Sequence, residues 1–208
     1  MTHILVFGDS ITYGAWDIEG GWVGRLRKYL DQQVIDSNYQ LYWIVYNLGI
    51  DGDTSSGLLK RFENEVKKRT CEREDRLIII DIGANDSIQN NKTKKLWCAT
   101  EKYEQNLKKL VELARKYTKN IVLIGPLRVD EPRVDPMPWL AGHSYKNNIL
   151  IEFYKKAESI AKQENIPFVG MWNLLENKDL ADGTHPTTEG HRKIFEVVKN
   201  FLVKEKMI

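Results

Sequence analysis

Short runs of consecutive apolar residues recur along this chain and alternate with segments that repeat every three to four residues. A run that is apolar at every position is typical of a strand buried on both faces of a sheet. Strands of this kind occur in parallel sheets, whose neighbouring strands are joined by helical crossovers. The five predicted strands are Ile4–Phe7, Tyr42–Leu48, Leu77–Ile82, Ile121–Ile124 and Phe168–Gly170.

Apolar residues between the predicted strands keep to one face of a helix. The stripes are Trp22, Leu26, Tyr29 and Leu30; Leu58, Leu59, Phe62 and Val66; Tyr103, Leu107, Leu110, Val111 and Ala114; Ile151, Tyr154, Ala157, Ile160 and Ala161; and Ile194, Val197, Val198, Phe201 and Leu202. We therefore expect an α/β fold, a three-layer α/β/α sandwich of flavodoxin-like type with a five-stranded parallel sheet. The 208 residues suit a single domain over 1–208.

The charge balance argues against nucleic acid as a partner. Lys and Arg number 31 and Asp and Glu 29, which leaves a formal net charge of +2, whereas binding of nucleic acid needs a concentrated basic face. No stretch has the roughly 20 apolar residues of a membrane span, and the N-terminus lacks the features of a signal peptide. We expect a cytoplasmic protein, a monomer or a homodimer, whose Cys71 and Cys98 are free thiols.

Polar residues that could carry chemistry follow the predicted strands. Ligands of open α/β sheets bind beyond the carboxyl ends of the strands. Ser10, Gly52, Asn85 and the segment after Ile124 are therefore expected to converge at one edge of the sheet. His185 follows the fifth predicted strand and should reach the same edge.

Ser10, Asp182 and His185 could form a nucleophilic group. A serine hydroxyl is a poor nucleophile until a base takes its proton, and a carboxylate can hold that base in the right tautomer. Asp182 and His185 are three residues apart in a turn-like segment, and Pro186 favours an extended backbone at His185. Taken singly, these residues could equally be turn residues and a surface histidine.

A serine that cleaves esters also needs donors for the negative oxygen that forms on the carbonyl group. Gly52 offers a backbone N–H with no side chain to obstruct a substrate, and Asn85 offers a side-chain amide. The alternative for both is ordinary turn chemistry, since Gly, Asn and Asp dominate turns.

Four blocks of the chain, taken together, resemble the GDSL family of hydrolases in its SGNH branch. The blocks are Gly8-Asp9-Ser10, the turn at Gly52, Gly83-Ala84-Asn85-Asp86 and Asp182-Gly183-Thr184-His185-Pro186. The resemblance implies that Ser10 is the nucleophile, that His185 is the base, and that Asp182 orients it. It also implies an oxyanion hole formed by the Ser10 and Gly52 backbone amides and the Asn85 side chain, in a mechanism without metal or cofactor.

The segment Gly125–Ser144 contains four of the six prolines and is predicted to be a long loop. Loops of this length in compact domains are usually functional. Met137 and Trp139 of this loop, and Trp16 after Ser10, are candidates for the substrate pocket; alternatively, the apolar residues of the loop pack on the core. Residues 126–131 also resemble a Pro-x-Val-Asp-Glu stretch of family members that hydrolyse small acetate esters.

The sequence thus predicts a carboxylic ester hydrolase that acts on small-molecule esters with short, acetyl-type acyl groups. The same residues could serve a lysophospholipase, a thioesterase or an acyltransferase. A non-catalytic ligand-binding module is the alternative from another class, and the complete set of site residues speaks against it. No long amphipathic lid is visible, which favours water-soluble esters over lipid aggregates.

Overall fold

The computed structural model describes residues 2–69 and 74–208, and within them five strands form one parallel sheet. The strands are β1 (Thr2–Gly8), β2 (Trp43–Gly49), β3 (Asp75–Asp81), β5 (Asn120–Ile124) and β7 (Phe168–Val169), in the order β2-β1-β3-β5-β7. Every neighbouring pair is parallel. This is the flavodoxin-like order, so the predicted fold class is confirmed.

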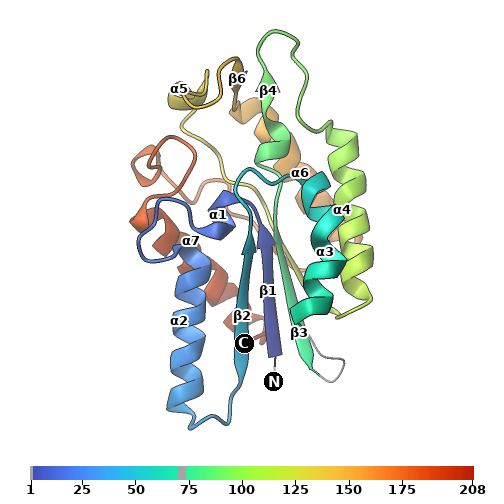
Figure 1. Cartoon of the computed structure of the whole chain (residues 1–208), viewed down its shortest axis with the longest axis vertical. Helices are drawn as coiled ribbons and strands as arrows, with labels where there is room; N and C mark the ends of the chain where they lie inside the picture. Colours follow the sequence, from blue (N-terminus) through green and yellow to red (C-terminus); the bar gives the residue numbers. More distant parts are fainter. Residues whose placement is uncertain (1, 70–73) are drawn as a thin grey trace.

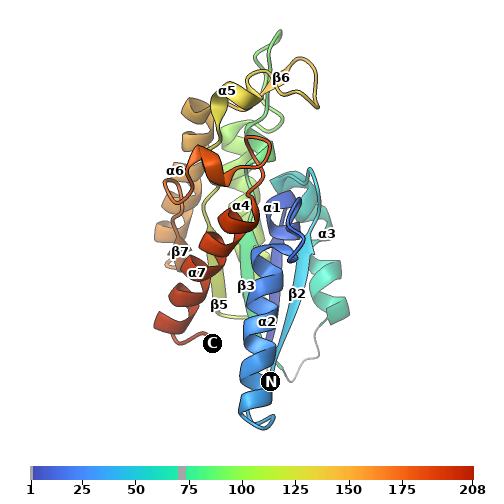
Figure 2. The ribbon, with the colours of Figure 1, turned by 90° about the vertical axis from the view of Figure 1, so that its left-hand side faces the viewer.

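Helices cover both faces of the sheet (Figure 1). The helices α3 (Ser55–Arg69), α4 (Thr100–Arg115) and α6 (Asn147–Gln163) pack on one face, and α2 (Gly21–Asp36) and α7 (Thr188–Lys204) on the other. Figure 2 shows α2 and α7 in front of the sheet. The result is the expected three-layer sandwich.

Successive residues of the central strands belong to opposite cores. Leu5 and Phe7 of β1 lie in the core under α3, α4 and α6, whereas Ile4 and Val6 lie in the core under α2 and α7. All four side chains are fully buried. Burying one such side chain stabilises the fold by about 1.5–3 kcal/mol, and burial on both faces explains why the strands are apolar throughout.

Several short elements gather at the carboxyl ends of the strands (Figure 1). They are α1 (Ser10–Tyr13), the 3-10 helices η1 (Asn85–Ser87) and η2 (Asn177–Asp179), α5 (Glu131–Val134) and a two-stranded sheet of β4 (Gln89–Asn90) and β6 (His143–Ser144). The segment Gly125–Ser144 is thus not a plain loop, because α5 and β6 lie within it. Its β6 pairs antiparallel with β4, which ties it to the segment that follows β3.

The cysteines and the length of the helices can also be compared with the sequence predictions. Cys98 is a free thiol and is buried, while Cys71 lies outside the described residues. No helix among the described residues combines the length and the apolar character that crossing a membrane requires.

Candidate active site

Ser10 lies at the sharp turn between β1 and α1. Asp9 caps α1, since its Oδ1 accepts a hydrogen bond from the Ile11 backbone N–H at 3.0 Å. The turn is possible only because residue 8 is glycine: a Cβ there would lie 2.0 Å from Thr12 Oγ1. This local geometry presents the Ser10 hydroxyl beyond the end of β1.

His185 and Asp182 extend a line of hydrogen bonds from Ser10. His185 Nε2 lies 2.9 Å from Ser10 Oγ, and His185 Nδ1 lies 2.6 Å from Asp182 Oδ2. An ionised carboxylate only accepts hydrogen bonds, so Nδ1 carries the proton and Nε2 is free to accept from the Ser10 hydroxyl. This arrangement can deprotonate a serine hydroxyl.

The Asp182 carboxylate is strongly held in its ionised form. Burial acts to raise its pKa, but hydrogen bonds from the His185 side chain and from the backbones of His185 and Thr184 outweigh burial and lower the pKa well below the usual range. The backbone N–H groups of Thr184 and His185 donate to Oδ1 at 3.0 and 2.8 Å. The Trp16 indole N–H donates to Oδ2 at 3.2 Å.

The turn that carries Asp182 and His185 is braced by the segment around α5. Arg133 donates to the carbonyl oxygens of Leu180 and Ala181 at 3.0 and 2.7 Å. The Asp130 N–H donates to the Gly183 carbonyl oxygen at 2.8 Å. Part of the long segment after β5 therefore positions the turn.

Three candidate donors for an anion lie near the Ser10 hydroxyl. They are the backbone N–H groups of Ser10 and Gly52 and the side-chain amide of Asn85. Gly52 adopts a left-handed backbone with φ of 69°, and the space where a Cβ would stand is open. Among the described residues, no acceptor is bonded to the backbone N–H of Ser10 or Gly52. Asn85, the first residue of η1, lines the same pocket with its side chain.

The Asn85 amide has a defined orientation. Its Nδ2 donates to the Asp53 carbonyl oxygen at 2.9 Å, and its Oδ1 accepts from the Tyr145 hydroxyl at 2.7 Å. The reverse orientation would place two acceptors, Oδ1 and the Asp53 carbonyl, against each other. Tyr145, which sequence reasoning missed, thus holds the amino group of Asn85 towards the Asp53 carbonyl oxygen and the carboxyl of Asp9, the residue before Ser10, which lies 3.5 Å from Nδ2.

Buried carboxyl groups lie directly behind the site. Burial, followed by the nearby Asp81, raises the pKa of Asp9 well above its usual value. Burial also raises the pKa of Asp81, although Thr12 Oγ1 donates to its carboxyl at 2.9 Å. Asp86 accepts hydrogen bonds from the Ser55 backbone at 2.8 Å and from its hydroxyl at 2.5 Å, and so joins two turns. Among the described residues, no cluster of His, Cys, Asp and Glu is arranged to share a metal ion.

A pocket of about 420 Å³ opens over these groups. Trp16 and Trp139, two of the candidates for substrate contact, line it, and each packs against the His185 ring, with centroid separations of 5.7 and 6.3 Å. Lys and Arg are absent from its described lining. The pocket is lined by Ser10, Trp16, Asp51, Gly52, Asn85, Ile88, Trp97, Trp139, Leu140, Tyr145, Asp182, Thr184 and His185.

Met137 occupies a different place from the one expected. Only 2% of its surface is exposed, and it packs with Val129, Val134 and Leu150 in an apolar cluster beneath the loop. The substrate-pocket assignment of Met137 is therefore replaced by a packing role, because its side chain fills this cluster. Trp139, two residues later, remains half exposed at the rim.

Comparisons with known proteins were consistent with this geometry. A family model described as GDSL-like Lipase/Acylhydrolase matches residues 4–198. No curated protein matches the chain in a sequence comparison.

Solved structures share the fold at low sequence identity. A lipase/acylhydrolase from Enterococcus faecalis is 23% identical, with a TM-score of 0.72 over 97% of this chain and 95% of that one. A catalytic mutant of Axe2, an acetylxylan esterase from Geobacillus stearothermophilus, is 24% identical, with a TM-score of 0.70 over 96% and 92%. A member of the lipolytic protein G-D-S-L family from Veillonella parvula is 20% identical, with a TM-score of 0.69 over 96% and 97%.

Proposed function

The chain belongs to the GDSL-like lipase/acylhydrolase family of carboxylic ester hydrolases, and we propose that it is a serine esterase for short-chain, acetyl-type esters of small molecules. The observation that carries the proposal is the unbroken line of hydrogen bonds from Ser10 through His185 to Asp182. A serine, a neutral imidazole and an ionised carboxylate in this order form the machinery of acyl transfer.

In the proposed reaction, Ser10 Oγ attacks the ester carbonyl carbon while His185 Nε2 takes the hydroxyl proton. The negative oxygen of the tetrahedral intermediate is held by the backbone N–H groups of Ser10 and Gly52 and by Asn85 Nδ2. The bond to the alcohol then breaks, and the alcohol leaves with the proton from Nε2. A water molecule, deprotonated by His185, attacks the acyl-serine and releases the acid.

Three observations support small, uncharged esters with short acyl groups. The pocket of about 420 Å³ is small and has aromatic walls. The sequence around residues 126–131 resembles that of family members that act on acetate esters. A structural relative carries the name acetylxylan esterase, which makes acetylated carbohydrates the natural substrates to test.

The residues that line the pocket also favour some ester substrates over others. Lysophospholipids and many thioester substrates carry phosphate groups, which proteins usually bind with Arg or Lys. The described lining of the pocket has neither residue. We therefore place esters of uncharged alcohols ahead of phosphate-bearing substrates.

Hydrolysis of p-nitrophenyl esters from acetyl to decanoyl tests the proposal, with the wild type beside Ser10→Ala. Ser159→Ala, at an exposed position on α6, is the matched control. We expect a maximum at two to four acyl carbons for the wild type and the control, and no turnover for Ser10→Ala. A maximum at eight carbons or more would refute the short-chain assignment. An inert wild type that a fluorophosphonate also fails to label would favour the ligand-binding module.

A further inference from the structure

A second hollow of about 700 Å³ opens beside the catalytic pocket, and we propose that it is a subsite for the alcohol part of an extended ester. The ligand class that it fits is an uncharged oligosaccharide of at least two rings, which carries the ester to be cleaved. This inference rests on the proposed esterase function and adds a second binding site to it.

The two hollows are neighbours. Trp16 and Asp51 line both of them, so Trp16 stands at their common edge. Besides Trp16 and Asp51, the second hollow is lined by Tyr13, Gly14, Ala15, Asp17, Ile18 and Gly20. A substrate anchored at Ser10 can therefore continue past Trp16 without leaving the protein surface.

The position of His185 indicates whether the acyl part or the alcohol part of the ester lies in the second hollow. The leaving oxygen must come close to His185 Nε2, because that atom returns the proton to it. The Trp16 ring stands edge-to-face against the His185 ring, at 5.7 Å between centroids. Trp139 packs against the same ring at 6.3 Å, but only Trp16 also lines the second hollow. A group attached to the leaving oxygen that extends past Trp16 therefore enters this hollow, and that group is the alcohol.

Trp16 is held in an unusual conformation. Its φ of 64° lies in the left-handed region, which a bulky residue rarely adopts and which persists only where the surroundings enforce it. Here the indole N–H bonds to the Asp182 carboxylate at 3.2 Å. The strained backbone thereby places the ring between the two hollows.

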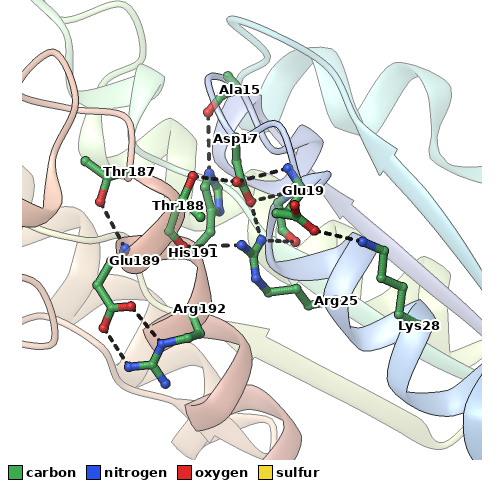
Figure 3. Close-up of polar contacts among 12 residues, drawn as sticks. Ala15, Asp17, Glu19, Arg25, Lys28, Thr187, Thr188, Glu189, His191 and Arg192 are labelled. Atoms are coloured by element: carbon green, nitrogen blue, oxygen red, sulfur yellow. Dashed lines mark hydrogen bonds and ion pairs between the residues drawn. The ribbon is translucent and has the colours of Figure 1, made fainter.

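The loop that carries Trp16 is fastened to the rest of the molecule by Asp17 (Figure 3). The Asp17 side chain is fully buried and pairs with Arg25. It also accepts hydrogen bonds from the Gly21 backbone at 3.0 Å and from Thr188 Oγ1 at 2.9 Å. Thr188 is the first residue of α7, so the loop is fixed to the helix that follows His185.

A fixed loop means that the hollow exists before a ligand arrives, which reduces the ordering cost of binding. The exposure of the apolar side chains that line this hollow has no other explanation in the fold. Trp16 is 69% exposed, Tyr13 61% and Ile18 95%, and all three line the second hollow. Grouped exposed apolar side chains mark binding surfaces.

The lining defines the chemical class of the occupant. Tyr13 and Trp16 offer aromatic faces and Ile18 an aliphatic one, which suit the C–H faces of sugar rings. The Asp51 carboxylate can accept hydrogen bonds from hydroxyl groups. The described lining holds no Lys or Arg that would pair with an anionic ligand.

Release of acetate from mono-acetylated xylotriose and from mono-acetylated xylose tests the proposal. We expect wild-type kcat/KM to be about tenfold higher for the trisaccharide, a gain expressed mainly in KM. The double variant Tyr13→Ala with Ile18→Ala should lose this preference. Ile35→Ala changes an exposed isoleucine of α2 away from both hollows and should keep the preference, and thermal melting checks that all variants are folded.

Each other outcome overturns the inference in a distinguishable way. Equal kcat/KM for both sugars, with p-nitrophenyl acetate still cleaved, would refute the subsite and leave the esterase intact. A preference that survives the double variant would place the second ring elsewhere. A preference for decyl acetate over ethyl acetate without any for the trisaccharide would refute the carbohydrate class. An enzyme inert to every ester would remove the proposed function and the subsite together.

Discussion

Replacement of Asp182 by asparagine should inactivate the site without disturbing its shape. In the wild type, Asp182 Oδ1 accepts two backbone N–H groups, from Thr184 and His185, at 3.0 and 2.8 Å. These two donors will keep the amide oxygen of the asparagine at that position. The amino group then takes the place of Oδ2, where it faces His185 Nδ1 and the Trp16 indole N–H.

This exchange reverses the hydrogen bond to the imidazole. An amino group only donates, so His185 Nδ1 must accept and the ring proton moves to Nε2. A protonated Nε2 at 2.9 Å from Ser10 Oγ cannot take the hydroxyl proton. In a serine protease the same change lowers kcat by about 10⁴, and we expect a loss of about 10³ to 10⁴ for Asp182→Asn.

Initial rates with p-nitrophenyl acetate, after active-site titration, measure this loss. Asp182→Ala leaves His185 free to adopt either tautomer, so it should be no less active than Asp182→Asn. Circular dichroism should be the same for both variants and the wild type. A folded Asp182→Asn enzyme within about tenfold of the wild-type rate would refute the role assigned to the carboxylate.

Three further predictions concern the surroundings of the site. Asn85→Ala should lower kcat by about 10²–10³, the usual cost of one oxyanion donor. Tyr145→Phe keeps the donor and removes one of the two contacts that orient it, so its loss should be smaller. Steady-state kinetics in which Tyr145→Phe is as damaging as Asn85→Ala would contradict this order. Burial acts to raise the Asp17 pKa, but the Arg25 ion pair and other hydrogen bonds lower it to about 2, so its contribution of about 2 kcal/mol is present above pH 4 and lost as pH falls towards 2. Urea unfolding should show the advantage of the wild type over Asp17→Asn shrinking over that range, and a pH-independent difference would count against the ion pair. Burial raises the pKa of Asp81 from about 4 to about 7, so the folded wild type keeps a proton that the unfolded chain has lost, and it loses stability as pH rises from about 4 to 7. Asp81→Asn should therefore gain stability relative to the wild type over that range and show no further gain above it; a constant difference would argue against a neutral Asp81.

Much of the fold could be predicted because it depends on local patterns. Consecutive apolar residues such as Ile4 and Leu5 face opposite cores. Because the strand is buried on both faces, every position of it is apolar, and the sequence shows this directly. The parallel arrangement then brings the strand ends together. For this reason the sequence predicts that Ser10 and His185, 175 residues apart, approach each other.

Irregular segments carry no such pattern. Met137 and Trp139 are two residues apart in the same segment, yet one fills an apolar cluster and the other stands at the pocket rim. A loop has no repeat from which the direction of a side chain could be inferred. Tyr145 likewise became recognisable only when the structure placed its hydroxyl against the Asn85 amide.

The sequence alone thus determined the layers, the order of the chain through them, and the set of residues that meet beyond β1, because strand burial and helical period are properties of neighbouring residues. The tertiary structure decided how those residues are held: Trp16 on Asp182, Tyr145 on Asn85 and Arg133 on the His185 turn. Each of these contacts joins segments distant in the chain. Their geometry depends on how the irregular segments pack, and the sequence pattern does not encode that packing.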